Sequence, residues 1–130
     1  MAHHANADVV RRYFTAVERD PTETSALYSP DVVLHYSGTH RLAGDHRGPT
    51  AIQELFQRSR DAFSGSQRLE VHDVLGSDDH GVALLAASAE LDGRRVMWNR
   101  VVVFHISDGR ITEQWILDGD QHLVDQIIGR

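Results

Sequence analysis

Apolar residues recur with two different periods along this chain, and the change between them separates helices from strands. Over residues 8–18 and 50–63 they are spaced by three and four positions, as on an amphipathic helix. From residue 67 onward they alternate with polar residues and many are β-branched, which is typical of strands. The pattern predicts, in order, helices over 8–18 and 23–28, a strand over 32–36, a long loop over 37–48, a helix from residue 50, strands near 68–75, 81–91, 95–106 and 111–118, and a helix over 120–128.

Short polar steps between the four late strands indicate how these strands pair. Asp92-Gly93 and Asp108-Gly109 each lie between two apolar runs, and Asp-Gly in that setting is a strong hairpin signal. Strands joined by tight turns form an antiparallel meander. A Thr-x-x-Gln capping-box pattern at 50–53 predicts the start of the third helix. Helices and antiparallel strands in separate parts of one chain predict an α+β domain, with helices on one face of the sheet.

The strand expected over 95–106 is apolar on both of its faces. Trp98 and Phe104 point to one face, and Met97 and Val103 point to the other. A strand with one wet face would alternate between apolar and polar residues, so both faces of this sheet need cover. Because the helices can cover only one face, we expect a second copy of the chain on the other. The resulting homodimer interface would bury on the order of 2,000 Å².

Composition narrows the possible chemistry. The chain has 130 residues, which suits a single domain spanning 1–130. It has no cysteine, and its 13 basic residues are all arginine, which excludes thiolate nucleophiles, disulfides and lysine Schiff bases. No cofactor is expected. His35, His40 and His46 lack the spacing of a zinc motif, so no metal site is expected either.

Charge and hydropathy restrict the partners. The formal net charge of -6 argues against nucleic acid, because phosphate binding needs a basic surface. The longest apolar runs are far shorter than the roughly 20 residues of a membrane helix. The N-terminal residues lack the basic and apolar regions of a secretory signal. We therefore expect a cytoplasmic protein that binds neither nucleic acid nor membrane.

Polar residues inside apolar strands are candidate site residues, since burying them costs free energy unless they are hydrogen-bonded. His35 interrupts the first strand, Asn99 and Arg100 interrupt the strand before the last hairpin, and Asp118 ends the last strand. If the last hairpin has a two-residue loop, Asn99 faces Asp118. If Gly109 instead forms a one-residue bulge, Arg100 faces Asp118. In either register the carboxylate gains a hydrogen-bonding partner.

Aromatic residues on the predicted inner surfaces are further candidates. Tyr13 lies on the apolar stripe of the first helix, where its hydroxyl needs a partner or a ligand. Asp120 lies where the N-cap of the last helix is expected, and it is the alternative to Asp118 as the acid that faces a pocket. The predicted substrate-binding residues are Tyr36, Phe56, Trp98, Asn99, Arg100, Trp115 and Asp120.

Several segments, taken in order, resemble a known family. They are Arg-Tyr-Phe-Thr-Ala-Val at 12–17, Leu-Tyr-Ser-Pro-Asp-Val-Val-Leu-His at 27–35, Leu-Ala-Gly-Asp-His-Arg-Gly at 42–48, Phe-His-Ile-Ser-Asp-Gly-Arg-Ile-Thr-Glu-Gln-Trp at 104–115, and Asp-Gln at 120–121. With them, almost the whole chain resembles the SnoaL-like branch of the nuclear transport factor 2 superfamily, which includes polyketide cyclases, ketosteroid isomerases and limonene epoxide hydrolases. The resemblance implies a cystatin-like fold, a cone-shaped curved antiparallel sheet wrapped by three to four helices around one apolar pocket. It also implies a homodimer.

The resemblance assigns roles to individual residues. Tyr13 falls where ketosteroid isomerases keep a tyrosine that donates a hydrogen bond to the developing oxyanion. The two acids of those isomerases fall near Tyr36 and Val102, and both are missing here. Cyclases of the SnoaL type combine a late-strand aspartate with a histidine, and the resemblance gives those roles to Asp118 and His35.

Two functions are compatible with these residues. The first is a cofactor-free acid–base isomerase or cyclase that acts on an apolar, carbonyl-bearing substrate, with His35, Asp118 and Tyr13 as catalytic residues. The alternative is a non-catalytic protein that binds or sequesters a hydrophobic metabolite in the same pocket. His35 or Asp118 pointing into a closed apolar pocket favours the enzyme, whereas both residues fully paired outside it favour the binding protein.

Overall fold

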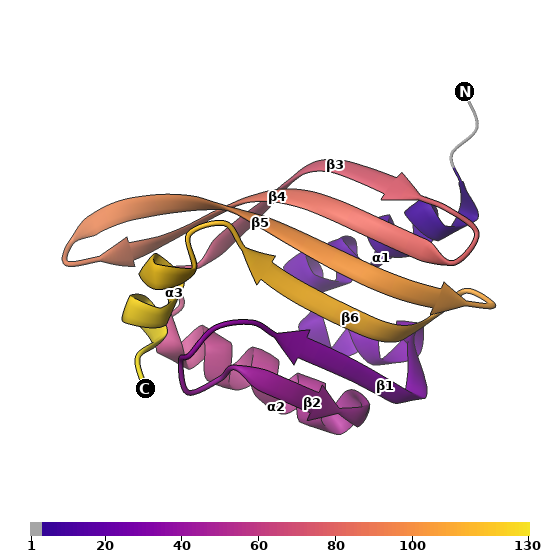
Figure 1. Cartoon of the computed structure of the whole chain (residues 1–130), viewed down its shortest axis with the longest axis horizontal. Coiled ribbons are helices and arrows are strands. Elements are labelled where there is room, and N and C mark those ends of the chain that lie inside the picture. Colours follow the sequence, from indigo (N-terminus) through magenta and orange to yellow (C-terminus); the bar gives the residue numbers. More distant parts are fainter. Residues whose placement is uncertain (1–3) are drawn as a thin grey trace.

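The computed structural model describes residues 4–130 and contains every helix and strand that the apolar pattern predicts (Figure 1). The chain therefore has the expected α+β fold. The elements are, in order, α1 (Ala5–Arg19), the 3-10 helix η1 (Pro21–Leu27), β1 (Tyr28–Tyr36), β2 (Gly44–Arg47), α2 (Gly48–Ala62), β3 (Arg68–Gly76), β4 (His80–Leu91), β5 (Arg94–Ser107), β6 (Arg110–Asp118) and α3 (Gln121–Ile128). None of the described helices has both the length and the apolarity to cross a membrane.

Six strands form one curved sheet in the order β2-β1-β6-β5-β4-β3. The late strands form the predicted antiparallel meander, and β2 is antiparallel to β1. The pair β1–β6 is parallel, so the sheet is not wholly antiparallel as expected. In Figure 1, α1 and α2 lie against one face of the sheet and α3 lies beside the end of β6. The helices and the inner face of the sheet enclose the core.

Two glycines allow α1 to lie close against the sheet. Gly76 of β3 pairs with Gly81 of β4, and a Cβ at Gly76 would lie 2.5 Å from the backbone nitrogen of Ala7. Asn6 fixes the same end of the helix, because its side-chain amide donates to two backbone oxygens of the β3–β4 turn at 2.8 and 2.9 Å. α1 is thereby held with Tyr13 facing the core.

Inner-face residues alternate along the strands and fill the core with aromatic and branched side chains. The ring of Tyr13 packs edge-on against Phe104 of β5, with ring centroids 5.2 Å apart. Each fully buried aliphatic or aromatic side chain contributes about 1.5 to 3 kcal/mol. The most deeply buried apolar residues include Val10, Tyr28, Val32, Leu34, Leu42, Ile52, Leu55, Phe104, Ile111 and Val124.

A short strand occupies part of the segment that was expected to be a loop. β2 pairs with the second half of β1, from Val33 opposite Arg47 to Tyr36 opposite Gly44. Its four residues are exposed or half-buried, so they show no apolar alternation. The pattern that reveals the longer strands is therefore missing here.

α2 begins differently from the prediction. It starts at Gly48, and Pro49 occupies its first turn, where the missing N–H would have no helical partner. The expected capping box does not form. Instead, the side-chain amide of Gln53 donates to the backbone oxygen of Pro21 and to the hydroxyl of Thr24, both at 3.0 Å. Gln53 therefore joins α2 to η1.

The pairing of β5 with β6 has the two-residue loop of the first predicted register and the Arg100–Asp118 pair of the second. The hairpin has a two-residue loop whose residues have φ values of 51° and 76°, the conformation of a type I′ turn. The register nevertheless shifts by one, because Thr112 of β6 has no partner and forms a bulge. Arg100, and not Asn99, therefore faces Asp118. The shift was expected at Gly109 and occurs three residues later.

The outer face of the sheet carries apolar side chains that no helix of the described chain covers. Met97 of β5 is 70% exposed and Leu117 of β6 is 43% exposed. Val101 lies opposite Leu117 on the same face. The helices pack against the other face. This surface agrees with the two-sided apolar pattern of β5.

Candidate functional site

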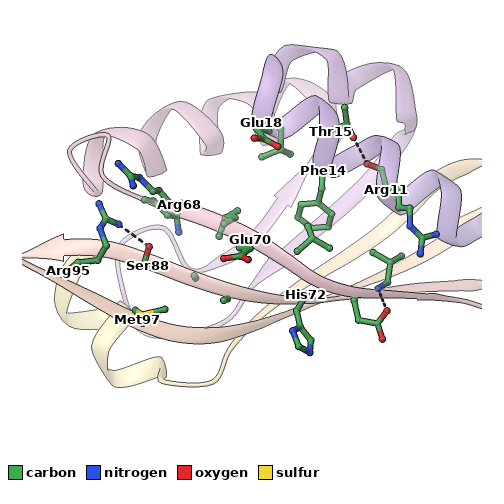
Figure 2. Close-up of a pocket in the computed structure, with 18 residues that line it drawn as sticks. Arg11, Phe14, Thr15, Glu18, Arg68, Glu70, His72, Ser88, Arg95 and Met97 are labelled. Carbon is green, nitrogen blue, oxygen red and sulfur yellow. Dashed lines mark hydrogen bonds between the residues drawn. The ribbon is translucent and has the colours of Figure 1, made fainter.

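The two main hollows of the described chain differ in character. The larger, about 1150 Å³, runs along α1 and the edge strand β3 (Figure 2). Its lining includes Ala87 from the inner face of the sheet and Met97 from the outer face, so it wraps around the sheet edge. Charged side chains such as Arg11, Arg68 and Glu70 border it. Binding sites for small molecules are concave and mostly apolar, which favours the other hollow.

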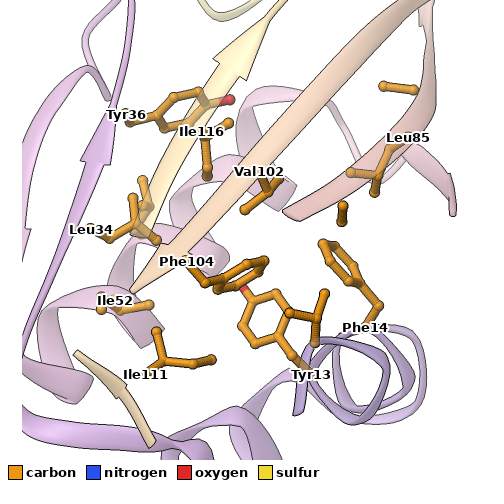
Figure 3. Close-up of a cluster of buried hydrophobic side chains, with 14 of the residues drawn as sticks. Tyr13, Phe14, Leu34, Tyr36, Ile52, Leu85, Val102, Phe104, Ile111 and Ile116 are labelled. Atoms are coloured by element: carbon orange, nitrogen blue, oxygen red, sulfur yellow. The ribbon is translucent and has the colours of Figure 1, made fainter. Parts of the chain in front are cut away.

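The second hollow is a cavity of about 370 Å³ that enters the core between α1, α2 and the inner face of the sheet. Figure 3 shows Tyr13 and Tyr36 toward opposite ends of this region, with Val102 and Ile116 between them. Its apolar walls are formed by Phe14, Val17, Leu55, Phe56, Leu69, Val102 and Ile116. Polar groups line it at the two ends and at its mouth.

One end of the cavity holds a hydrogen-bonded group of three side chains, the tyrosine cluster, formed by Tyr13, Tyr28 and Gln114. Tyr28 donates to the side-chain oxygen of Gln114 at 2.9 Å, and the Gln114 amide nitrogen donates to the hydroxyl oxygen of Tyr13 at 3.0 Å. The hydroxyl oxygens of Tyr28 and Tyr13 lie 3.3 Å apart. Since Tyr28 donates its single hydroxyl proton to Gln114, the Tyr13 hydroxyl can donate its own proton to the Tyr28 oxygen or to a ligand.

The other end holds the arginine cluster, formed by Arg100, Asp118, Trp98 and Tyr36. The Nε of Arg100 donates to Asp118 Oδ1 at 2.7 Å, and Trp98 Nε1 donates to the same oxygen at 2.8 Å. Arg100 Nη2 donates to the Tyr36 hydroxyl at 3.1 Å. Among the described residues, none accepts a hydrogen bond from Arg100 Nη1. Asp118 is therefore fully engaged, while Arg100 keeps a donor group beside the cavity.

Burial determines the protonation of these groups. It raises the pKa of Tyr13 and of Tyr36 above the usual value, so both phenols stay protonated near neutral pH. Burial works against the charge of Arg100, but Tyr36 and Asp118 outweigh it and raise the pKa of the guanidinium. Glu18, Arg19 and Arg60 line the cavity at exposed positions, whereas its buried part presents neutral hydroxyls and one permanent cation, Arg100. Such groups donate hydrogen bonds and stabilise negative charge.

The arrangement of a curved sheet, wrapping helices and one apolar cavity agrees with a comparison against known families. Residues 10–114 match the SnoaL-like domain. The chain belongs to the SnoaL-like family.

Relatives of this SnoaL-like domain occur in bacteria. An uncharacterized protein of Mycobacterium tuberculosis (strain ATCC 25618 / H37Rv) is 31% identical over 114 residues, which cover 86% of this chain and 87% of that protein. Bal32a from a soil-derived mobile gene cassette has 28% identity and a TM-score of 0.87, covering 96% of this chain and 97% of that one. A protein of unknown function with a cystatin-like fold from Xanthomonas campestris has 27% identity and a TM-score of 0.87, covering 96% and 98%.

Four of the predicted site residues of the SnoaL-like domain line its cavity. They are Tyr13, Tyr36, Phe56 and Arg100. Trp98 and Asp118 also lie on the inner face, but behind Arg100, and the side chain of Asp118 is 0% exposed. The packing of Trp98 is fixed further by stacking on Phe63, with ring centroids 6.0 Å apart.

His35 lies on the opposite side of the sheet from the cavity, so its predicted pairing with Asp118 is wrong. Its strand neighbours Leu34 and Tyr36 are buried on the inner face, and alternation turns His35 outward. There Nδ1 lies 2.6 Å from Asp45 and Nε2 lies 2.5 Å from Glu113. Burial disfavours the charged ring, but hydrogen bonds and charges of Glu113 and Asp45 outweigh it and raise the pKa of His35. This histidine is held between two carboxylates, which favour its charged form.

Three other predicted substrate-binding residues also lie away from the cavity. Asn99 is exposed on the outer face, because it alternates along β5 with the buried residues Trp98 and Arg100. Trp115 lies on the outer face, where its ring stacks on His35 with centroids 5.2 Å apart. Asp120 caps α3 by accepting a hydrogen bond from the backbone nitrogen of Leu123 at 3.1 Å. Their expected contact with a ligand is therefore not part of this arrangement.

The sequence pattern did not identify Gln114 or Tyr28 as residues of the candidate site. Gln114 is 1% exposed and interrupts the apolar residues of β6, the same signal that drew attention to His35. Its face depends on the bulge at Thr112, which the sequence left open. Tyr28 was assigned to the end of a helix and is instead the first residue of β1.

Within residues 4–130, no three His, Asp or Glu side chains come together in a cluster that would hold a metal ion. His40 is buried beside Tyr36, and both of its ring nitrogens contact backbone atoms. Nε2 lies 3.2 Å from the oxygen of Ser37, and Nδ1 accepts from the nitrogen of Leu42 at 3.1 Å. Burial lowers the pKa of His40, which keeps the ring neutral.

Proposed function

We propose that this SnoaL-like protein binds a small, largely apolar organic molecule in the cavity between α1, α2 and the sheet. The observation that carries the proposal is the cavity itself, about 370 Å³ with apolar walls and a few polar groups at fixed positions. A ligand in it would displace water from Phe56, Val102 and Ile116. Polar groups at the two ends would orient the ligand.

Tyr13 is the group that would recognise an oxygen atom of the ligand at the inner end. It accepts from Gln114, so its own proton can turn toward the cavity. Its raised pKa keeps it a donor. A carbonyl or hydroxyl oxygen placed there would receive a hydrogen bond in surroundings with little water, where hydrogen bonds are stronger than at a surface.

Binding without catalysis is favoured over acid–base chemistry by the state of the candidate base. Asp118 has no exposed side-chain surface, and its Oδ1 accepts from both Arg100 and Trp98. A carboxylate fixed in this way is not positioned to remove a proton from a substrate. His35, the other candidate, faces away from the cavity.

An isomerase or cyclase acting on a carbonyl-bearing substrate is the second candidate. The Tyr13 hydroxyl favours it, because a buried donor that stabilises a carbonyl oxygen also stabilises the enolate formed from it. This reaction would need Asp118 to leave Arg100 and act as a base. Turnover that Asp118→Asn abolishes, with ligand affinity retained, would support the enzyme over the binding protein.

Native mass spectrometry of the purified protein tests the binding function. We expect a non-covalent adduct of a small organic molecule that disappears in Ser59→Trp, because Ser59 lines the cavity and an indole there would obstruct it. Arg58→Trp is the matched control, since Arg58 is exposed on the same helix and does not line the cavity. Equal ligand occupancy in Ser59→Trp, Arg58→Trp and the parent chain would contradict the proposal.

A further inference from the structure

The cavity has polar groups at two separate levels, that is, at two separate positions along the strands β5 and β6. Gln114 of the tyrosine cluster and Asp118 of the arginine cluster are four residues apart on β6, and their partners on β5, Phe104 and Arg100, are also four residues apart. At about 3.3 Å per residue, the two levels are about 13 Å apart along the sheet. Among the described strand residues, apolar side chains such as Val102 line the wall between them.

The arginine cluster has donors that the protein does not use. Arg100 is 5% exposed, yet within residues 4–130 no acceptor lies in hydrogen-bond range of its Nη1. The Tyr36 hydroxyl accepts from Arg100 Nη2, and none of the described residues receives the proton of Tyr36. Arg100 and Tyr36 both line the cavity, so these two donors are available to an acceptor bound there.

The chemistry of that acceptor follows from how the carboxylate beside Arg100 is used. Asp118 is already occupied by Arg100 and Trp98. A site that only donates favours the deprotonated form of an acid. A guanidinium also binds a carboxylate or a phenolate more strongly than a neutral oxygen, because the hydrogen bonds are charge-assisted.

We propose that the ligand is an elongated apolar molecule with an anionic oxygen group at the Arg100 and Tyr36 end and a neutral carbonyl or hydroxyl oxygen at the Tyr13 end. The proposal rests on the binding function above and specifies its ligand class. An aromatic or polycyclic acid with a second oxygen at its far end fits both the spacing and the apolar wall. A ligand with only one of these groups would leave one cluster unsatisfied.

Calorimetry with four matched probes tests the proposal on the intact chain. The probes are 4′-hydroxybiphenyl-4-carboxylate, its neutral 4-carboxamide, biphenyl-4-carboxylate and 4-hydroxybiphenyl. We expect the first to bind at least about tenfold more tightly than the carboxamide, because a charge-assisted pair is replaced by a neutral one. We also expect Tyr13→Phe to remove the advantage of the hydroxyl group while keeping the advantage of the acid.

A paired variant assigns the acid preference to Arg100. Arg100→Gln combined with Asp118→Asn removes both charges and leaves neither ion unpaired, and it should abolish the preference for acid over amide. Arg94→Gln is the control, because Arg94 is exposed on the same strand and does not line the cavity. Its acid preference should equal that of the parent chain.

The outcomes separate this inference from the binding function. If acid and amide bind the parent chain within twofold of each other, the anionic-ligand inference is wrong and the binding function stands. If none of the four probes binds, the inference is also wrong, whereas the binding function is decided by the mass spectrometry of Ser59→Trp. If the paired variant keeps the full preference, Arg100 is not the residue that recognises the acid.

Discussion

Arg100 and Asp118 face each other across β5 and β6, and Arg100 Nε donates to Asp118 Oδ1 at 2.7 Å. Their side chains are 6% and 0% exposed. Two opposite charges buried side by side are costly to separate, because each is stabilised mainly by the other. The pair therefore fixes both the register of the two strands and the direction of the guanidinium.

Removing one member of this pair should destabilise the fold strongly. Asp118→Ala leaves the Arg100 cation buried without its carboxylate, and we expect a loss of about 3 to 5 kcal/mol in the free energy of unfolding. The double variant Arg100→Met with Asp118→Leu should lose much less. Urea denaturation measures both. Asp120→Ala, which removes only the cap of α3, should cost about 1 kcal/mol. A loss in Asp118→Ala no larger than in Asp120→Ala would contradict this account.

Stability should depend on pH through His35. Its folded-state pKa is raised above 6.5 by Glu113 and Asp45 despite burial, so its stabilising contribution is complete below pH 6.5 and is lost as pH rises through the folded-state pKa. The stability difference between the parent chain and His35→Gln should therefore shrink above pH 6.5. Urea midpoints from about pH 5.5 to 9 test this. His122→Gln, at an exposed position of α3, should leave the pH profile unchanged.

The network of His35, Asp45 and Glu113 should also make stability depend on pH in the acidic range. The hydrogen bond from His35 lowers the pKa of Asp45 below 3.8. The contribution of Asp45 is therefore present above pH 3.8 and is lost as pH falls through the lower folded-state value. A pH profile for His35→Gln that runs parallel to the parent profile at both ends would show that this network does not stabilise the fold.

We infer that a second copy of the chain covers the outer face of the sheet. Met97 and Leu117 are exposed there, and large apolar side chains exposed on a sheet face often mark a protein interface. Light scattering should give twice the 14.6 kDa of one chain. Met97→Glu with Leu117→Glu should give the single-chain mass. Val71→Glu is the control, an exposed apolar residue on the edge strand. A parent chain that scatters as 14.6 kDa at every concentration would exclude the dimer.

The closeness of α1 to the sheet predicts unequal effects of two glycine substitutions. A Cβ at Gly76 would meet the backbone of Ala7, whereas a Cβ at Gly81 would meet the side chain of Val10, which can move more easily. Gly76→Ala should lose about 1 to 3 kcal/mol, and Gly81→Ala should lose less. Because α1 carries Tyr13, Gly76→Ala should also weaken ligand binding. Thermal unfolding and calorimetry measure the two effects, and the reverse order would be inconsistent with the packing.

The apolar pattern was sufficient to predict every element except β2, because long amphipathic helices and alternating strands bury most of their apolar side chains in this fold. The site was harder to predict. Tyr13 was found because the face of a helix follows from its period. His35 was misplaced and Gln114 was missed because a one-residue change of phase reverses the face of a strand residue. β2 was missed because its pairing with β1 depends on contacts that leave no periodic signal.

The unpaired Thr112 lets the tip of the β5–β6 hairpin change in length without altering the cavity. Deleting Thr112 would join Ile111 to Glu113 and leave a regular ladder in which Asp118 keeps its partner and its face. An insertion between Glu113 and Asp118 would instead turn the later side chains to the opposite side of the sheet, unless a new bulge absorbed it. We therefore expect changes of length to be tolerated near Thr112 and not between Glu113 and Asp118.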